Sequence, residues 1–470
     1  MKHMKYLLVG AFLLGMATTV TAQDVQSQVA NITNVINANK GNLKAVEAQV
    51  KEFYKANKKN AEALVGLGRA YLNVQDTTYS SKYANEAIKR DKNYAPGYIL
   101  LGDIEVVKDN GGAAAGWYLQ AINFAPQDPL GYIKYAGIYR GVSPDESVSK
   151  LEELRKVLPD YPVDAEAGHL YYLSNRFDKA VEYYDKADKA KMNAGQLAEY
   201  AFAAYLSGNP QKSLEVSSHG VQRYPRHAAL NRLTFYNNTD LKNYDEALTY
   251  GDRLFNASDS AKISALDYKY YGHAYSGANA LDKAIEMFKK SLEQDPKSID
   301  LYKQIAEAYS GLGDFDNAIS YYNQYMEKND KLSTSDYIAL ARIYMAQGDK
   351  ATGQAKTEAL KKADKVYEEL GQKAPSNIEY ATYMRARVNS LMDPETTEGL
   401  AKPFYDDYAR RVEAHPTKSE ADKVTLVEAY SYLGYYYYLK NDKATSDSYW
   451  KKILEIDPEN ATAKAALGMK

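Results

Sequence analysis

The sequence of 470 residues contains no cysteine. This absence excludes disulfides, thiolate metal sites, cysteine nucleophiles and a lipid anchor carried by a cysteine. Tryptophan and phenylalanine are also scarce, at 2 and 10 residues, whereas tyrosine occurs 45 times. Aromatic packing in this chain must therefore depend mainly on phenols, which bury an apolar ring and keep a polar tip.

An excess of basic residues is also missing, because the formal net charge is −2 at pH 7. This balance disfavours nucleic acid as a partner. Beyond the N-terminal segment no stretch of eighteen uninterrupted apolar residues occurs, so no membrane span is expected there. A chain that is 45% hydrophobic and 26% charged has the composition of a globular protein.

The N-terminus, "MKHMKYLLVGAFLLGMATTVTAQD", has the three parts of a secretory signal peptide. Lys2 and Lys5 form a positive region, an apolar stretch follows, and Val20-Thr21-Ala22 is a small-residue cleavage site. We expect cleavage after Ala22 and an exported, soluble, periplasmic protein. An uncleaved N-terminal anchor is the alternative.

The rest of the chain repeats itself. "YKYYGHAYSGANALDKAIEMFKKSLEQDP" from Tyr268 is followed 34 residues later by "YKQIAEAYSGLGDFDNAISYYNQYMEKND" from Tyr302. The same order of aromatic, small, aromatic, alanine and aromatic residues recurs at this spacing along most of the chain. The small residue of each copy stands at Gly68, Gly102, Ala136, Gly168, Ala201, Phe235, Gly272, Ala306, Ala341, Ala386 and Gly434.

These residues match the tetratricopeptide (TPR) pattern of W-x2-L-G-x2-Y, A-x3-F and a closing proline, and the chain resembles a TPR protein over nearly its whole length after the signal. The resemblance implies an all-α, right-handed superhelical solenoid of about eleven helix-turn-helix repeats. The small residue lets the two helices of a pair approach closely. "SGLGDF" and "LSNRF" are expected to form the turns between them.

The expected organisation has five parts. They are a signal peptide at 1–22, N-terminal capping helices at 23–60, a TPR array at 61–377, an extended irregular repeat with a loop at 378–426, and a last TPR with a capping helix at 427–470.

Three departures from the pattern stand out. Phe235 occupies a small-residue position and Gly251 an aromatic one, which predicts irregular packing around 228–260. "ATGQAKTEALKKADKVYEEL" predicts a lengthened second helix. "SLMDPETTEGLAKP" contains Pro394, Gly399 and Pro403 and is the best candidate for a loop or hinge.

Catalytic and cofactor motifs are missing from the sequence. The histidines are dispersed, no H-E-x-x-H occurs, and neither a P-loop nor a G-x-S-x-G elbow is present. The G-x-G of "VGLGRAY" falls inside a predicted helix and is better explained by helix packing. We therefore expect no enzyme, no cofactor and no metal.

The TPR resemblance implies that the first helix of each pair lines a concave groove. Its groove positions come one residue after the framework positions. They are Phe202, Tyr205, Lys269, His273, Lys303, Glu307, Arg342, Met345, Tyr435 and Tyr438. The middle of this groove is basic and its ends are aromatic. His273 stands where a carboxylate-clamp TPR has asparagine, so that activity is not carried over.

We expect a non-catalytic interaction scaffold of the cell envelope that binds an extended peptide or protein partner in this groove. One hypothesis is that Lys269, Lys303 and Arg342 attract an acidic or C-terminal carboxylate group while the tyrosines hold the chain. Alternatively, these cations are only solvated surface charges. A different alternative is a glycan-binding accessory protein of an outer-membrane uptake system, since tyrosines stack on sugar rings.

The run "YSYLGYYYYLK" from Tyr430 illustrates the division between framework and groove. Tyr430, Leu433, Gly434 and Tyr437 are predicted to be core, and Tyr432 and Tyr436 are predicted to meet a neighbouring element. Only Tyr435 and Tyr438 remain for the groove.

Overall fold

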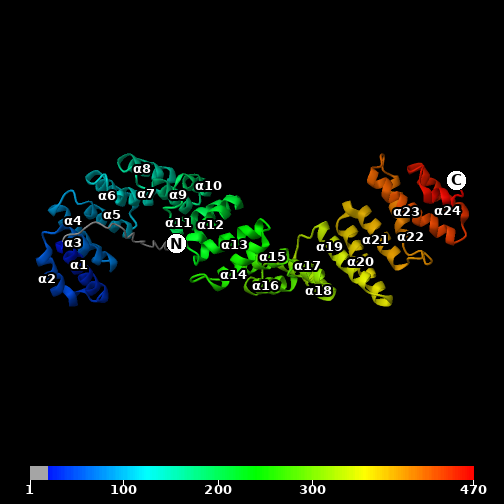
Figure 1. The fold of residues 1–470 in the computed structure, drawn as a ribbon, viewed down its shortest axis with the longest axis horizontal. Coiled ribbons are helices and arrows are strands. Elements are labelled where there is room, and N and C mark those ends of the chain that lie inside the picture. The colour runs from blue at the N-terminus through cyan, green and yellow to red at the C-terminus, as the bar shows by residue number, and fades with distance from the viewer. Residues whose placement is uncertain (1–19, 470) are drawn as a thin grey trace. The chain divides into compact units, whose positions relative to one another are not determined.

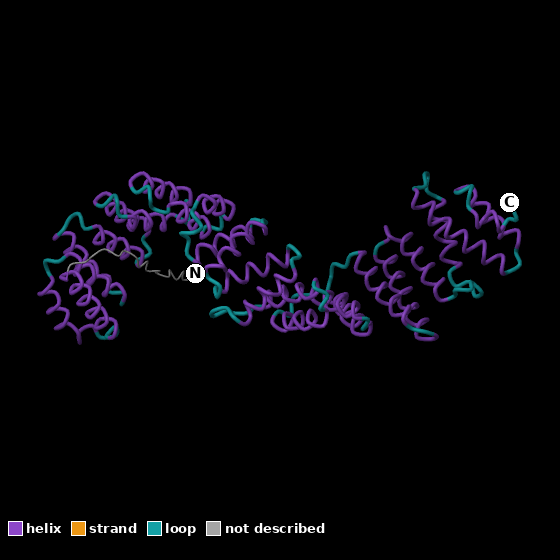
Figure 2. Tube along the Cα trace, viewed as in Figure 1, coloured by secondary structure: helices purple, strands orange, loops and turns teal. Residues whose placement is uncertain are grey.

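The computed structural model describes residues 20–469, and the regular structure in that part of the chain is entirely helical (Figure 2). The all-α repeat architecture is confirmed. The predicted signal peptide lies outside the described residues except for residues 20–22, with which the first helix begins.

Eleven helix pairs follow one another, each holding one of the predicted small-residue positions (Figure 1). They are α3 (Ala61–Asn73) with α4 (Thr77–Arg90), α5 (Ala95–Val107) with α6 (Gly111–Phe124), α7 (Pro129–Tyr139) with α8 (Pro144–Val157), α9 (Val163–Leu173) with α10 (Phe177–Lys186), α11 (Ala194–Leu206) with α12 (Pro210–Arg223), α13 (Ala228–Asp240) with α14 (Tyr244–Asn256), α15 (Ala265–Gly277) with α16 (Leu281–Gln294), α17 (Asp300–Leu312) with α18 (Phe315–Lys328), α19 (Thr334–Lys350) with α20 (Gly353–Lys373), α21 (Ile378–Met392) with α22 (Lys402–Glu413), and α23 (Glu420–Leu439) with α24 (Lys443–Ile456).

Further helical elements flank the pairs. They are α1 (Val20–Ala38), η1 (Leu43–Val46) and α2 (Glu47–Asn57) before the first pair, η2 (Pro375–Asn377) before α21, and α25 (Ala461–Ala466) after the last pair. Helix α1 packs on α3 as the first helices of neighbouring pairs pack on each other. The N-terminal segment therefore adds another layer to the stack.

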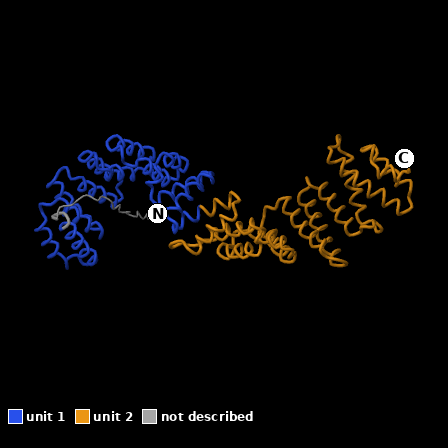
Figure 3. The backbone as a smooth tube through the Cα atoms, viewed as in Figure 1, with its two compact units in different colours: residues 1–233 blue, residues 234–470 orange. Residues whose placement is uncertain are grey.

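The chain forms two compact units, residues 1–233 and 234–470 (Figure 3). Their boundary falls inside the predicted array of 61–377. The predicted boundary between 426 and 427 falls inside α23, which begins at Glu420 after a capping box of Ser419 and Asp422. The lengthened second helix is confirmed, because α20 spans 21 residues.

In four pairs a glycine of the first helix accommodates an aromatic ring of the second helix. A Cβ added to Gly102 would stand 2.3 Å from the ring of Tyr118, and one added to Gly272 would stand 2.4 Å from the ring of Phe288. Gly168 and Gly434 meet Tyr184 and Trp450 in the same way. This contact sets the close approach of the two helices, because any larger side chain would push the ring away.

Phe235 and Gly251 keep this contact with the sizes exchanged. Phe235 is completely buried, and a Cβ added to Gly251 would stand 3.3 Å from its ring and 3.0 Å from the ring of Tyr271 in the following pair. The packing departs from the regular contact here as predicted, because the large residue stands on the first helix and the small one on the second.

The turn inside most pairs contains one residue with a left-handed backbone. These residues are Gln75, Asp109, Asn175, Gly208, Lys242, Asn279, Gly313 and Asn441. Asn175 and Gly313 lie in the two turns predicted from "LSNRF" and "SGLGDF". Glycine, asparagine and aspartate adopt this conformation most easily, which explains their frequency here.

Candidate functional site: the face of the first helices

The predicted groove tyrosines and phenylalanine form two stacked pairs, in which Phe202, Tyr435 and Tyr438 are exposed and Tyr205 is half-buried. On α11, the rings of Phe202 and Tyr205 are stacked with centroids 6.5 Å apart, and Phe202 is 38% exposed. On α23, Tyr435 and Tyr438 are stacked with centroids 6.4 Å apart and are 42% and 66% exposed. Residues three apart on a helix share one side, so each pair offers a flat apolar surface.

A titratable cluster lies beside the first pair. The Phe202 ring contacts Tyr172 of α9 edge-on at 6.4 Å. His169 Nδ1 lies 2.7 Å from Glu199 Oε2, which also accepts a hydrogen bond of 2.8 Å from the Tyr184 hydroxyl. The hydrogen bond to Glu199 raises the pKa of His169, although burial opposes it.

Lys269 and Lys303 are bound to carboxylates of the next pair. Lys269 Nζ lies 2.5 Å from Asp300 Oδ2, and Lys303 Nζ lies 2.8 Å from Asp336 Oδ1. Asp336 is 3% exposed, and its pKa is lowered by the lysine and by Ser333 despite burial. Any acidic partner would have to compete with these carboxylates for the two ammonium groups.

The remaining predicted groove residues differ in their exposure and in their contacts. Arg342 is exposed, and no carboxylate partner is found for it among the described residues. His273 is half-buried with its ring edge-on to Phe288 at 5.1 Å, and burial followed by the charge of Lys269 lowers its pKa. Met345 is half-buried and packs against the core of α18–α21.

Bonds from one first helix to the next recur along both units. Arg69 binds Asp103 at 3.1 Å across 34 residues. The Tyr236 hydroxyl donates to Asp267 at 2.8 Å across 31 residues, and the Tyr383 hydroxyl donates to Glu428 at 2.7 Å across 45 residues. The groove side of the first helices thus carries polar bonds that join neighbouring repeats as well as surface for a partner.

The predicted loop after α21 is organised by one buried carboxylate. Asp393 is 5% exposed and accepts hydrogen bonds from the backbone N–H groups of Thr397 at 3.0 Å, Glu398 at 3.0 Å and Gly399 at 2.7 Å. A carboxylate with several backbone donors fixes the loop conformation.

The tyrosine run of α23 packs against this loop. The Tyr432 hydroxyl accepts a hydrogen bond of 3.3 Å from the N–H of Ala401, and a Cβ on Gly399 would stand 2.2 Å from the Tyr436 ring. Tyr430, at 4% exposed, and Leu433 are buried as predicted. Tyr437, also predicted to be core, is only half-buried, with its ring stacked on Tyr449. The structure thus places the groove pair Tyr435 and Tyr438 on the exposed side of a helix whose other tyrosines hold the loop and the core.

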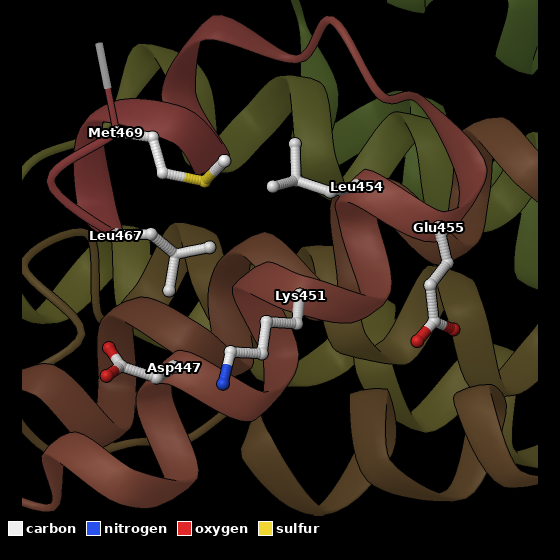
Figure 4. Close-up of a pocket in the computed structure, with 6 residues that line it drawn as sticks. All are labelled: Asp447, Lys451, Leu454, Glu455, Leu467 and Met469. Carbon is white, nitrogen blue, oxygen red and sulfur yellow. The ribbon is translucent and has the colours of Figure 1, made fainter.

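A hollow of about 640 Å³ lies between α24 and the C-terminal segment (Figure 4). The side chains of Leu454, Leu467 and Met469 surround it, and Asp447 and Lys451 lie at its edge. Lys443 already binds Asp447 at 2.7 Å, so this carboxylate is not free for a ligand.

A second hollow, of about 450 Å³, opens between α17 and α19 on the predicted groove face. Sequence reasoning named two of its residues, Glu307 and Arg342, but not the hollow itself or the phenol of Tyr322 at its wall. An alignment of the repeats with one another could have indicated the hollow, because it shows that Ile338 stands where an earlier repeat has Lys134.

Metal and membrane chemistry receive no support from the described residues. Between residues 20 and 469 no three His, Asp or Glu side chains are placed to hold a metal ion. No helix in that part of the chain combines the length and apolar character that a membrane crossing requires.

Comparison with known families identifies the repeat. Two family models, each described as tetratricopeptide repeat, match residues 276–339 and 165–191. No curated protein matched the chain.

Solved structures align with parts of the chain. The C-terminal part of a TPR repeat-containing protein from Cytophaga hutchinsonii is 25% identical, with 58% of this chain and 100% of that chain covered and a TM-score of 0.47. A TPR protein from Parabacteroides merdae is 14% identical, with 53% and 98% covered and a TM-score of 0.33. MamA is 26% identical, with 34% and 93% covered and a TM-score of 0.31. The assignment to the TPR class rests on the family matches and on the helix pairs themselves.

Proposed function

We propose that this tetratricopeptide-repeat protein is a non-catalytic scaffold of the cell envelope that holds an extended peptide or protein segment on the face of its first helices. The observation that carries the proposal is the exposure of aromatic side chains at the groove positions of α11 and α23. A buried aromatic stabilises the fold, whereas an exposed stacked pair offers apolar surface that a partner can cover.

Neighbouring aromatics show that the exposure depends on position within the helix. Tyr430 on α23 and Tyr200 on α11 are 4% and 1% exposed, although each lies within eight residues of an exposed ring. The exposed rings come one residue after framework positions, where a TPR array lays a peptide. Extended chain in such a groove binds through side-chain pockets and polar contacts spread over several repeats.

Lys269, His273, Lys303 and Arg342 are included in the proposed groove. Arg342 is the best of them for an acidic group of the partner, because its guanidinium is exposed while Lys269 and Lys303 bind Asp300 and Asp336. Combining Lys269→Glu with Arg342→Glu should weaken capture of a partner and flatten its dependence on salt. Unchanged capture would show that the charges of Lys269 and Arg342 do not contribute to partner binding.

Site-specific photo-crosslinking tests the groove directly. A photoreactive phenylalanine analogue is placed at 438 or at 202, and a matched control is placed at 380 or at 79, where Tyr380 and Tyr79 are 37% and 45% exposed. Expression in the native cell followed by mass spectrometry should give a recurring partner segment from 438 and a recurring partner segment from 202. Equal products from all four positions, or none from 438 and 202, would contradict the proposal.

The alternative, a glycan-binding accessory protein, is supported by the same exposed rings, because sugars stack on flat aromatic faces. Soluble envelope oligosaccharides should raise the melting temperature of the protein if this alternative holds, and Tyr435→Ala with Tyr438→Ala should abolish the shift. A protein scaffold would show crosslinks without that thermal shift.

The envelope location is part of the proposal and is supported by the N-terminal sequence. It requires a signal peptide of residues 1–22 that is removed on export. Cell fractionation with sequencing of the purified N-terminus should find the protein in the periplasm beginning at Gln23. A protein that remains in the cytoplasm with its first residues intact would contradict it.

A further inference from the structure

The hollow between α17 and α19 contains polar groups without partners. It is lined by Glu307, Ser310, Tyr322, Ser335, Ile338, Ala339, Arg342 and Ile343. Tyr322 is completely buried, and its hydroxyl has no hydrogen-bond partner among the described residues. A buried phenol without a partner costs free energy, which a ligand that supplies the missing bond would recover.

Glu307 faces the same space from α17. Its side chain is exposed, yet its pKa is raised because the protein around the groove displaces water from the carboxylate. A carboxylate in a concave surface behaves in this way, since it is open to a ligand but poorly solvated. Glu307 has no ion pair within hydrogen-bonding distance among the described residues, because the neighbouring Lys303 binds Asp336.

The same two positions form a complete site in an earlier repeat. Tyr118 and Asp103 are 15 residues apart, as are Tyr322 and Glu307, and both pairs follow the same small-residue position. The Tyr118 hydroxyl donates to Asp103 at 2.8 Å. Asp103 also accepts from Arg69 at 3.1 Å and from Lys134 at 2.9 Å, and is 6% exposed.

The cations of that complete site are missing in the later repeat. Arg69 comes 34 residues before Asp103 and Lys134 comes 31 residues after it. At these distances from Glu307 the sequence has His273 and Ile338. Burial lowers the pKa of His273, so its ring supplies no positive charge near neutral pH. Ile338 thus stands in the position of Lys134, and it lines a hollow in the later repeat.

We propose that this hollow binds the primary ammonium group of a lysine side chain from the extended partner. The ammonium takes the place that Lys134 has on Asp103, with Glu307 accepting its charge and the Tyr322 and Ser310 oxygens available as further acceptors. The four-carbon stem lies along Ile338, Ala339 and Ile343, as lysine stems do on apolar surface.

The other charges of the hollow restrict the partner sequence. Arg342 lines it, and the Lys303–Asp336 ion pair adjoins it without a net charge. A run of consecutive cations would be repelled by Arg342, whereas a neutral or acidic residue beside the lysine would not. The partner segment therefore carries a single lysine with neutral or acidic neighbours.

A small probe tests the site on the full chain. The protein is labelled with ¹³C at isoleucine methyl groups, and Nα-acetyl-lysine methylamide is titrated while the methyl signals of Ile338 and Ile343 are followed by NMR. We expect saturable shifts of both signals. Matched probes with norleucine or Nε-acetyl-lysine should bind roughly tenfold more weakly, because they lack the charge.

Variants identify the groups responsible. Glu307→Gln should lower affinity for the lysine probe by roughly tenfold and Tyr322→Phe by a smaller factor. Glu293→Gln, which removes the same charge from an exposed site on α16, should leave affinity unchanged. Equal binding of lysine and norleucine, or equal binding by the protein and Glu307→Gln, would overturn the proposal.

A substitution within the chain gives a second test that does not require a ligand. Ile338→Lys restores the residue found at the equivalent position in the complete site and should close the hollow with a bond to Glu307. This variant should keep its melting temperature and lose the lysine probe, whereas Ile338→Lys with Glu307→Gln should melt lower. A lower melting temperature for Ile338→Lys that Glu307→Gln does not worsen would overturn the proposal.

This inference rests on the proposed function for the source of the lysine, and the two can fail separately. If crosslinks from 438 and 202 recur but the lysine probe does not bind, only the assignment of the hollow is lost. If the lysine probe binds but no partner segment is crosslinked, the hollow remains a lysine site and the proposal that the first helices hold an extended partner is rejected.

Discussion

The ring of Phe235 lies on Gly251 with 3.3 Å between the ring and the point where a Cβ would stand. In four other pairs the ring belongs to the second helix and the small residue is a glycine of the first, as with Tyr118 on Gly102. The contact between two helices therefore depends on the combined volume of the two positions and not on which helix supplies the ring.

Moving the ring from position 235 to position 251 should recover part of the unfolding free energy that Phe235→Ala removes. Phe235→Ala should cost about 3–5 kcal/mol of unfolding free energy, because it leaves a cavity in a buried site. Adding Gly251→Phe places the ring on the second helix and should recover about 1 kcal/mol or more of that loss. Chemical denaturation followed by circular dichroism measures both. A double variant less stable than Phe235→Ala would contradict the exchange of volume.

Two alanine substitutions in neighbouring helices should have opposite signs. Gly102→Ala places a Cβ 2.3 Å from the Tyr118 ring and should destabilise the protein by about 1–3 kcal/mol. Gly116→Ala lies on the exposed side of α6 with nothing within 4 Å of the added Cβ, and should stabilise it by about 1 kcal/mol. Thermal melts of the two variants provide the comparison, and equal effects would show that the ring contact is unimportant.

Asp393→Ala should loosen the loop between α21 and α22 without unfolding the array. The substitution removes the acceptor for four backbone N–H groups, those of residues 397–400, which should cost about 1–3 kcal/mol locally. Hydrogen exchange should accelerate at residues 396–400 and remain unchanged in α17 and α18. Glu369→Ala, at an exposed position of α20, is the control. Unchanged exchange in the loop would show that packing against Tyr432 and Tyr436 is sufficient.

His169 should make stability depend on pH in a defined direction. Its pKa is raised from 6.5 by the bond to Glu199, so the folded state binds the proton more tightly than the unfolded state. Its stabilising contribution is complete below about pH 6.5 and is lost as the pH rises through the raised value. The difference in unfolding free energy between the protein and His169→Asn should therefore shrink from pH 6 to pH 9. A difference that grows over this range would show that burial dominates.

A turn residue offers a stabilising change. Lys242 adopts a left-handed backbone with φ of 63°, which is unfavourable for a residue with a Cβ. Lys242→Gly should relieve part of that cost and stabilise the protein by up to about 1 kcal/mol. Asn175→Gly, where asparagine already tolerates the conformation at φ of 56°, should change stability much less. Denaturant midpoints of the two variants decide the matter.

The repeat pattern of the sequence was sufficient to predict the helix pairs, their turns and the burial of Tyr430 and Leu433. These features depend on spacing within one repeat, which a sequence shows directly. The exposure of Phe202, Tyr435 and Tyr438 follows from the same spacing.

The bonds between repeats could not be predicted in the same way. Whether Lys303 reaches Asp336 depends on the rotation of one pair on the next and on the reach of a flexible side chain. The phenol of Tyr322 is unpaired although Glu307 stands where Asp103 stands in the earlier repeat, and this depends on the direction that the Glu307 side chain takes. Sequence spacing does not show such a direction. The order of the 393–401 loop depends on backbone donors, which no side-chain pattern shows.

The contacts described above fall into two classes with different mechanical consequences. A ring on a glycine, as at Gly272 and Phe288, holds one pair together, whereas Lys303 with Asp336 joins one pair to the next. In a linear array the first class of contact sets the intrinsic stability of one repeat, and the second sets the coupling between neighbouring repeats. A substitution that disturbs the contact of Phe288 with Gly272 should therefore lower the melting temperature of that repeat. Removal of the Lys303–Asp336 ion pair should instead let the repeats on its two sides melt at separate temperatures.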